Sequence, residues 1–231
     1  MPLELMRQRR VKLALVIYDC DGVIVDSEPV ANRVTAAAVS QLGWLITPAE
    51  SDRHFLGMTF TDMVPVIEAR IGRPLPAGWK EALMQTLIDR LAEEATAIPG
   101  AISALHGMAA LDLPWRIASN SSHEEMRVKF GRLGISQLVQ GRVHSHRDVA
   151  RGKPAPDLFL AAAAAQGVDP AGCVVIEDSV TGARAAAAAG MDCLGYAPHG
   201  NEAGLRAVGA VPFRSMFDLP TLLAAGKAAA S

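Results

Sequence analysis

The feature that most constrains this chain of 231 residues is the short apolar run at residues 13–18, which ends in Asp19-Cys20-Asp21-Gly22. A short run rich in strand-forming residues is typical of a buried strand in a parallel sheet. The carboxyl ends of such strands line the crevice in which open α/β sheets bind ligands. We therefore expect both carboxylates to lie in a functional crevice, with Cys20 turned away from it as a small buried residue.

Apolar strands and helical segments alternate from residue 99 onward, which predicts a parallel sheet with helical crossovers. Further strands are expected at residues 115–119, 140–145, 173–177 and 193–196, and helices at 101–110, 123–133, 156–166, 180–189 and 202–208. Residues 27–96 show only helical segments, at 27–43, 60–71 and 80–95, with Ser27 as a plausible N-cap. The prediction is an α/β core formed by residues 11–26 and 97–231, interrupted by an all-helical insert at 27–96.

The composition and charge of the chain limit the kinds of partner it is expected to bind. The formal net charge is −2, which gives no reason to expect nucleic acid or an anionic membrane surface. No apolar run approaches the roughly 20 residues of a membrane span. The first apolar run ends in acidic residues, so we do not interpret it as a signal peptide. Three cysteines resemble neither a disulfide framework nor a zinc site, so a reducing cytoplasm is the simplest setting. The sequence is compatible with either a monomer or a homodimer.

Polar residues also follow the later strands. Ser119-Asn120 follows the second predicted strand, Glu177-Asp178 follows the fourth, and Lys153 stands between Gly152 and Pro154 ahead of a helix. These ends are expected to meet at one rim of the sheet. Carboxylates suit a hard cation such as Mg²⁺, while an ammonium, hydroxyls and helix N-termini suit phosphate oxygens. The mixture of charges favours phosphoryl chemistry.

Asp19 and Asp21 suggest a division of roles. Asp19, on the rigid strand, is the predicted nucleophile that would form an aspartyl-phosphate. Asp21 is the predicted acid and base, which would protonate the leaving oxygen and then activate water.

These four segments, in this order, resemble the four motifs of the haloacid dehalogenase-like superfamily. The resemblance implies a Rossmann-like core, a helical cap formed by the insert, and Mg²⁺ as cofactor. It further implies that Ser119 and Lys153 hold the transferring phosphoryl group. Asp178, the side chain of Asp19 and the main-chain oxygen of Asp21 would hold the metal. Glu177 would be a further ligand or a partner of one.

The stretch at residues 19–28 resembles the branch that contains β-phosphoglucomutase and small sugar-phosphate phosphatases. Mutases of this branch have a histidine and a lysine where this chain has Ala31 and Leu56. We therefore favour a phosphatase acting on a small phosphorylated substrate, a sugar phosphate or a sugar-acid phosphate such as phosphogluconate. The alternatives are a phosphosugar mutase and a non-catalytic sugar-phosphate-binding protein.

Substrate selection is expected to involve the insert. Arg53, His54 and Gly57 lie in a segment expected to be a loop, and Glu28 and Asn32 lie about one turn apart on the first helix of the insert. Arg53 and His54 have the alternative interpretation of solvated residues at a helix end. Asn120, at the end of the second predicted strand, completes the predicted set of substrate-binding residues.

Overall fold

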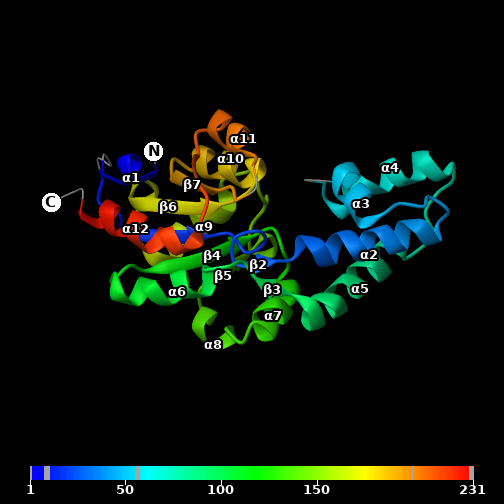
Figure 1. The fold of residues 1–231 in the computed structure, drawn as a ribbon, viewed down its shortest axis with the longest axis horizontal. Coiled ribbons are helices and arrows are strands. Elements are labelled where there is room, and N and C mark those ends of the chain that lie inside the picture. The colour runs from blue at the N-terminus through cyan, green and yellow to red at the C-terminus, as the bar shows by residue number, and fades with distance from the viewer. Residues whose placement is uncertain (1, 8–10, 56–57, 199, 229–231) are drawn as a thin grey trace.

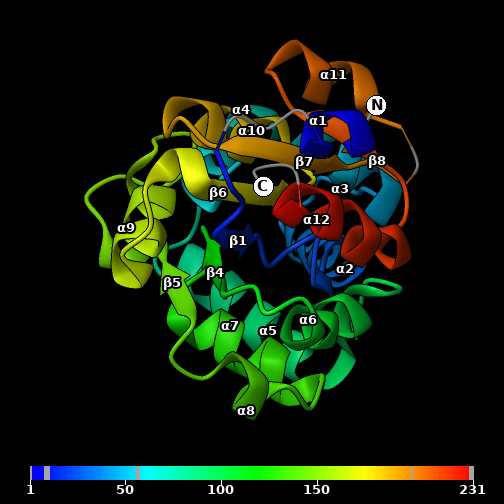
Figure 2. The same cartoon turned by 90° about the vertical axis from the view of Figure 1, so that its left-hand side faces the viewer.

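The computed structural model describes residues 2–7, 11–55, 58–198 and 200–228. Its centre, seen in Figure 1, is a six-stranded parallel sheet, and Figure 2 labels all six strands. Their order is β5-β4-β1-β6-β7-β8. The strands are β1 (Leu15–Tyr18), β4 (Trp115–Ser119), β5 (Val143–Ser145), β6 (Cys173–Glu177), β7 (Asp192–Tyr196) and β8 (Val211–Phe213). The predicted α/β fold class is confirmed.

Helices cover both faces of this sheet (Figure 2). One face packs against α6 (Ala101–Ala110), α7 (His123–Arg132) and α12 (Leu219–Ala228). The other face packs against α9 (Asp157–Gln166), α10 (Val180–Ala188) and α11 (Glu202–Ala207). The short helix α1 (Pro2–Arg7) lies against α12, and α8 (Ser136–Val139) follows α7.

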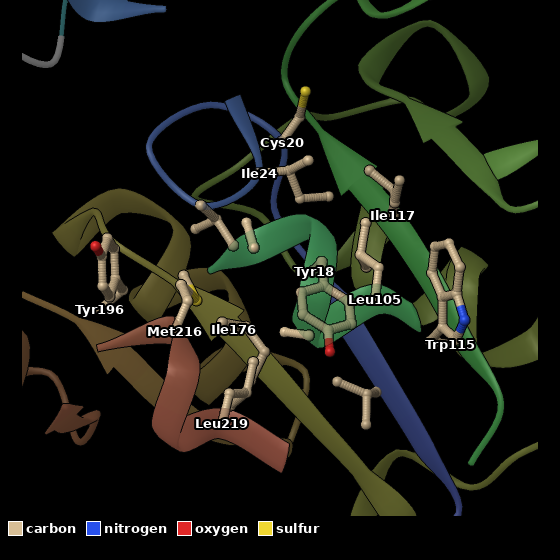
Figure 3. Packing of buried hydrophobic residues seen from close by; sticks show 14 of the residues in the cluster. Tyr18, Cys20, Ile24, Leu105, Trp115, Ile117, Ile176, Tyr196, Met216 and Leu219 are labelled. Carbon is tan, nitrogen blue, oxygen red and sulfur yellow. The ribbon is translucent and has the colours of Figure 1, made fainter. Parts of the chain in front are cut away.

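Strand β1 is buried on both sides, as its uninterrupted apolar run predicts. Val16 and Tyr18 belong to the core under α6 and α7, whereas Leu15 and Ile17 belong to the core under α9 and α10. Figure 3 shows Tyr18 among the side chains of the first core, with its ring 6.2 Å from that of Trp115 between centroids. Because β1 lies between β4 and β6, the polar residues that follow all three strands end side by side.

Four described helices that follow β1 in the sequence and precede β4 extend away from the sheet, and we call them the cap (Figure 1). They are α2 (Glu28–Gln41), α3 (Pro48–Phe55), α4 (Phe60–Ile71) and α5 (Trp79–Glu94). The chain enters and leaves the cap through β2 (Val25–Asp26) and β3 (Thr96–Ala97), which pair antiparallel. The predicted division at residues 26/27 and 96/97 falls at this ribbon and stays a prediction.

Two local expectations need correction. Arg53 and His54 were expected in a loop or, alternatively, at the solvated end of a helix. They lie in the last turn of helix α3, so the loop is corrected and the alternative agrees with the structure. The reason lies in Thr47 and Glu50, which exchange hydrogen bonds at the start of that helix and stabilise it. Ser27 precedes α2 but makes no side-chain capping bond, because its hydroxyl donates to Asp21 instead. Across the described ranges, no helix has the length and apolar character needed to cross a membrane.

Candidate active site

The turn after β1 brings both motif carboxylates into the crevice. The amides of Ile24 and Val25 donate to the carbonyl of Cys20, and the amide of Gly22 donates to the carbonyl of Val25. Gly22 adopts a φ of 72°, which favours glycine. A Cβ at this position would lie 2.0 Å from Oδ2 of Asp178, so glycine also leaves room for that carboxylate.

Asp19 and Lys153 form a buried ion pair. Nζ of Lys153 lies 2.8 Å from Oδ1 of Asp19 and 2.7 Å from Oε1 of Glu177. Burial raises the pKa of Asp19 to about 7; the Lys153 ammonium opposes this shift, and the charge of Glu177 reinforces it. Burial disfavours the charged form of Lys153 as well, but the two carboxylates outweigh it and raise its pKa. The lysine therefore stays charged between two acidic groups.

Glu177 is fully buried and uses both carboxylate oxygens within the protein. Oε1 contacts Lys153, and Oε2 accepts hydrogen bonds from the amide of Asp178 at 3.1 Å and from the hydroxyl of Ser179 at 2.8 Å. The amide of Ser179 also donates to Oε2, at 3.1 Å. These bonds hold the loop after β6 in place and leave Glu177 better suited to support a ligand than to be one.

Asp19 and Asp178 lie close enough to bind one metal ion, with Glu177 beside them. Within the described residues they form the one group of three or more potential metal-ligating side chains whose ligand atoms lie within 4.8 Å of one another. Burial, and then the charges of Glu177 and Asp19, raise the pKa of Asp178 well above its ordinary value. A cation is what lets such clustered carboxylates ionise, and an all-oxygen donor set fits Mg²⁺.

Asp21 is held apart from that cluster by a separate set of donors. Oδ1 accepts hydrogen bonds from Ser27 at 2.5 Å and from Nζ of Lys129 at 2.7 Å. Oδ2 accepts one from Ser121 at 2.7 Å, and the hydroxyl of Ser119 lies 3.5 Å away. Burial opposes ionisation of Asp21, but Lys129 and these hydrogen bonds overcome it and lower the pKa. The main-chain oxygen of Asp21 as a metal ligand stays a prediction.

Sequence reasoning missed Lys129 and Ser121. The signal was present: Lys129 lies on the face of α7 that carries Met126 and Phe130, three residues before and one after it, and that face is buried. A lysine on the apolar face of an amphipathic helix is unusual and calls for a buried partner. Asp21 is that partner.

Ser119 and Asn120 lie at the carboxyl end of β4, as expected. The hydroxyl of Ser119 accepts the amide of Ser121 at 3.0 Å. The side chain of Asn120 binds the backbone of Lys153 at two points, accepting from its amide at 2.9 Å and donating to its carbonyl at 3.1 Å. Asn120 therefore fixes the loop that carries Lys153, and its substrate contact stays a prediction.

The predicted cap residues lie in different places. Glu28 faces other acidic groups, since burial and the charges of Asp52 and Asp26 raise its pKa. Asn32 donates to Asp52 at 3.1 Å.

Arg53 and His54 are exposed, and the ring of His54 packs against that of Trp44, also in the cap, with 5.0 Å between the ring centroids. Gly57 and Leu56 lie outside the described residues. A groove of 540 Å³ between α2 and α5 contains none of the predicted site residues.

Comparison with known proteins agrees with this geometry. The haloacid dehalogenase-like hydrolase family matches residues 13–190, which include all four predicted motifs. The chain belongs to the haloacid dehalogenase-like hydrolases. This hydrolase is 29% identical to the 6-phosphogluconate phosphatase of Escherichia coli K12 over 182 residues, 78% of this chain and 81% of that protein.

Two further similarities extend the comparison. This haloacid dehalogenase-like hydrolase is 31% identical over 186 residues to hexitol phosphatase A of Escherichia coli K12, covering 75% of this chain and 78% of that one. A solved structure of a HAD family hydrolase from Deinococcus radiodurans, with bound phosphate and sodium, matches with a TM-score of 0.79 and 31% identity. That match covers 94% of this chain and 97% of the other.

Proposed function

We propose that this hydrolase is a Mg²⁺-dependent phosphatase that cleaves a sugar phosphate or sugar-acid phosphate through an aspartyl-phosphate on Asp19. The observation that carries the proposal is the pairing of each motif carboxylate with its own buried lysine, Asp19 with Lys153 and Asp21 with Lys129. Two carboxylates kept in different environments can take different roles in one reaction. The relatives named as phosphatases support the reaction class.

In the first step, an Asp19 oxygen attacks phosphorus and the bond between phosphorus and the ester oxygen breaks. Because Lys129 and the hydrogen bonds favour the Asp21 carboxylate, Asp21 first takes up a proton from solvent. It gives this proton to the ester oxygen, and the sugar leaves as an alcohol. In the second step, Asp21 takes a proton from water as the water oxygen attacks phosphorus. The bond between Asp19 and phosphorus then breaks, which releases inorganic phosphate and regenerates the carboxylate.

Lys153 and Ser119 would bind the phosphoryl oxygens, because Lys153 lies beside Asp19, Ser119 lies beside Asp21, and both are buried. Asp19, Asp178 and the main-chain oxygen of Asp21 would hold Mg²⁺, with Glu177 holding Lys153 and the Asp178 loop. The metal, when bound, supplies charge that draws the phosphate and the carboxylate nucleophile together.

Two alternatives make different predictions. A phosphosugar mutase would move phosphate between positions of one sugar, and a binding protein would retain the ester intact. Ala31, where mutases of this branch have a histidine, packs against the apolar core. That placement favours hydrolysis.

The test is phosphate release from a panel of sugar phosphates, sugar-acid phosphates and hexitol phosphates, with Mg²⁺ and with excess EDTA. We expect Mg²⁺-dependent release from the parent protein and none from Asp19→Asn, with the fold checked by circular dichroism. An isomeric sugar phosphate without phosphate release would assign a mutase. Ester binding without any turnover would assign a binding protein.

A further inference from the structure

Lys129 is a buried cation that has no role of its own in the steps of the proposed reaction. The residue is 2% exposed, although lysine is one of the residue types least often buried. Its ammonium lies 2.7 Å from Oδ1 of Asp21 and 2.9 Å from the hydroxyl of Ser121. Removing a charge from water is costly, and the pairing with Asp21 offsets part of that cost.

The position does not need a lysine for packing. Met126 and Phe130, its neighbours on the same face of α7, are apolar and fill the core beneath the sheet. A side chain of similar length without charge would pack against the same surface, as volume-conserving substitutions in cores generally do. The ammonium is therefore explained by what it binds.

Lys129 and Ser121 form a connected set of donors around one carboxylate. Ser121 donates to Oδ2 of Asp21 and accepts from Lys129, while Lys129 itself binds Oδ1. Lys129 comes from α7 and Ser121 from the loop after β4, and together with Ser27, which precedes α2, they fix the plane of the Asp21 carboxylate. A carboxylate held in this way cannot rotate freely about its χ angles.

We propose that Lys129, through Ser121, is a positioning residue that orients the Asp21 carboxylate toward the leaving oxygen of the substrate. This inference rests on the proposed function, because it needs Asp21 to be the proton donor. Lys129 differs in this from Lys153, which pairs with the nucleophile Asp19 and is expected to contact the phosphoryl group. Lys129 acts through Asp21, which serves the leaving oxygen in the first step and the attacking water in the second.

The consequence is a dependence on the leaving group. A sugar alkoxide is a poor leaving group and needs a well-placed proton, whereas p-nitrophenolate departs without one. Misplacing a general acid costs about 10²–10⁴-fold in rate where the proton is needed. Lys129→Met should therefore lower kcat/KM for a sugar phosphate by about 100-fold. For p-nitrophenyl phosphate the loss in kcat/KM should be below about fivefold, since cleavage of its phosphate ester bond gains little from an acid.

The experiment measures both esters with the full-length parent, Lys129→Met and Ser121→Ala, with KM and kcat separated. The matched control is Arg127→Met, which removes a cation of the same helix that is exposed and pairs only loosely, at 4.0 Å, with Glu124. The control should retain the parent values on both esters. Ser121→Ala keeps the buried ion pair, so it should fold even where Lys129→Met does not, and it should show the same selective loss.

A double variant separates positioning from other roles. If Lys129 acts through Asp21, then adding Lys129→Met to Asp21→Asn should cost no further activity on the sugar phosphate. Equal losses on both esters, or additive losses in the double variant, would overturn the inference and make Lys129 a phosphate-binding or purely structural residue. A parent that hydrolyses neither ester would instead overturn the proposed function itself.

Discussion

The carboxylate of Glu177 occupies the space beside Gly182: a Cβ at residue 182 would lie 1.6 Å from Oε1 of Glu177. Helix α10 can therefore begin against the end of β6 only because residue 182 has no side chain. Glu177 contacts Lys153, and Lys153 contacts Asp19. The absence of a side chain at residue 182 therefore allows all three charged groups to take these positions.

Gly182→Ala should disturb that chain of contacts. The methyl group must displace Glu177, a fully buried side chain, so we expect a loss of about 1–3 kcal/mol in the free energy of unfolding. Phosphatase activity should fall at least about tenfold, because a shift equivalent to 1.4 kcal/mol at the reacting groups already has that effect. Urea unfolding and steady-state kinetics measure the two quantities.

The matched control is Gly131→Ala in α7. There the nearest heavy atom to a new Cβ is the hydroxyl of Ser136 at 4.0 Å. Alanine is the better helix former, so this variant should be more stable by up to about 1 kcal/mol with unchanged activity. Equal behaviour of the two variants would contradict the packing argument at Gly182.

The metal-free protein should lose stability as pH rises. Asp19 has an ordinary pKa of 3.8 when unfolded and one of about 7 when folded, so folding takes up a proton between these values. Its contribution is complete below the lower value and is lost as pH rises through the upper one. In EDTA, Tm should be lower at about pH 8 than at about pH 5, and Mg²⁺ should raise it more at the higher pH.

Asp19→Asn supplies the control for this pH effect. The imidazole of His144 also contributes to the pH dependence of stability, because burial lowers its pKa. The difference in Tm between the parent and Asp19→Asn therefore reports the Asp19 carboxyl together with its effect on the pKa of Asp178. An equal slope of Tm with pH in both proteins would show that Asp19 does not cause it.

Asp178 and Glu177 should differ in what they do for the metal. Asp178→Asn removes a predicted ligand and should weaken Mg²⁺ binding by more than about 100-fold. Glu177→Gln should weaken it only about tenfold, because Glu177 already binds Lys153 and the Ser179 hydroxyl. Isothermal titration calorimetry with Mg²⁺ compares the two. The reverse order would make Glu177 the direct ligand.

Asn120→Ala should loosen the loop that carries Lys153. It removes two hydrogen bonds to the Lys153 backbone, each contributing about 0.5–1.5 kcal/mol. We expect lower kcat on both sugar and aryl esters, since Lys153 serves the phosphoryl group and not the leaving group. A rise in KM for the sugar ester alone would instead indicate that Asn120 contacts the sugar.

The sequence predicted best where a local pattern determines the structure. The alternation of apolar runs and polar ends identified β4 and β6 to the residue, because a central parallel strand must be apolar throughout. The short strand β8 was missed because Pro212 breaks its pattern, and a proline is tolerated there since β8 is an edge strand.

The predicted site was incomplete where contacts join distant residues. Lys129 lies 108 positions after Asp21, and no spacing in the sequence connects them. Ser27 has the residue type and position of a helix cap, yet its hydroxyl serves Asp21. In both cases local propensity describes the element correctly, while the partner of the side chain depends on tertiary packing.

The antiparallel ribbon of β2 and β3 has a consequence for how such a protein can change. Asp26 and Thr96 are paired neighbours, so the excursion of the chain through the cap starts and ends at one place. A two-residue turn suffices to join an antiparallel pair. The cap can therefore be replaced or removed at this ribbon without changing the order of the strands in the sheet. The proposed roles of the cap in substrate choice and of the core in the reaction are in this sense separable, open to exchange by recombination or by grafting in the laboratory.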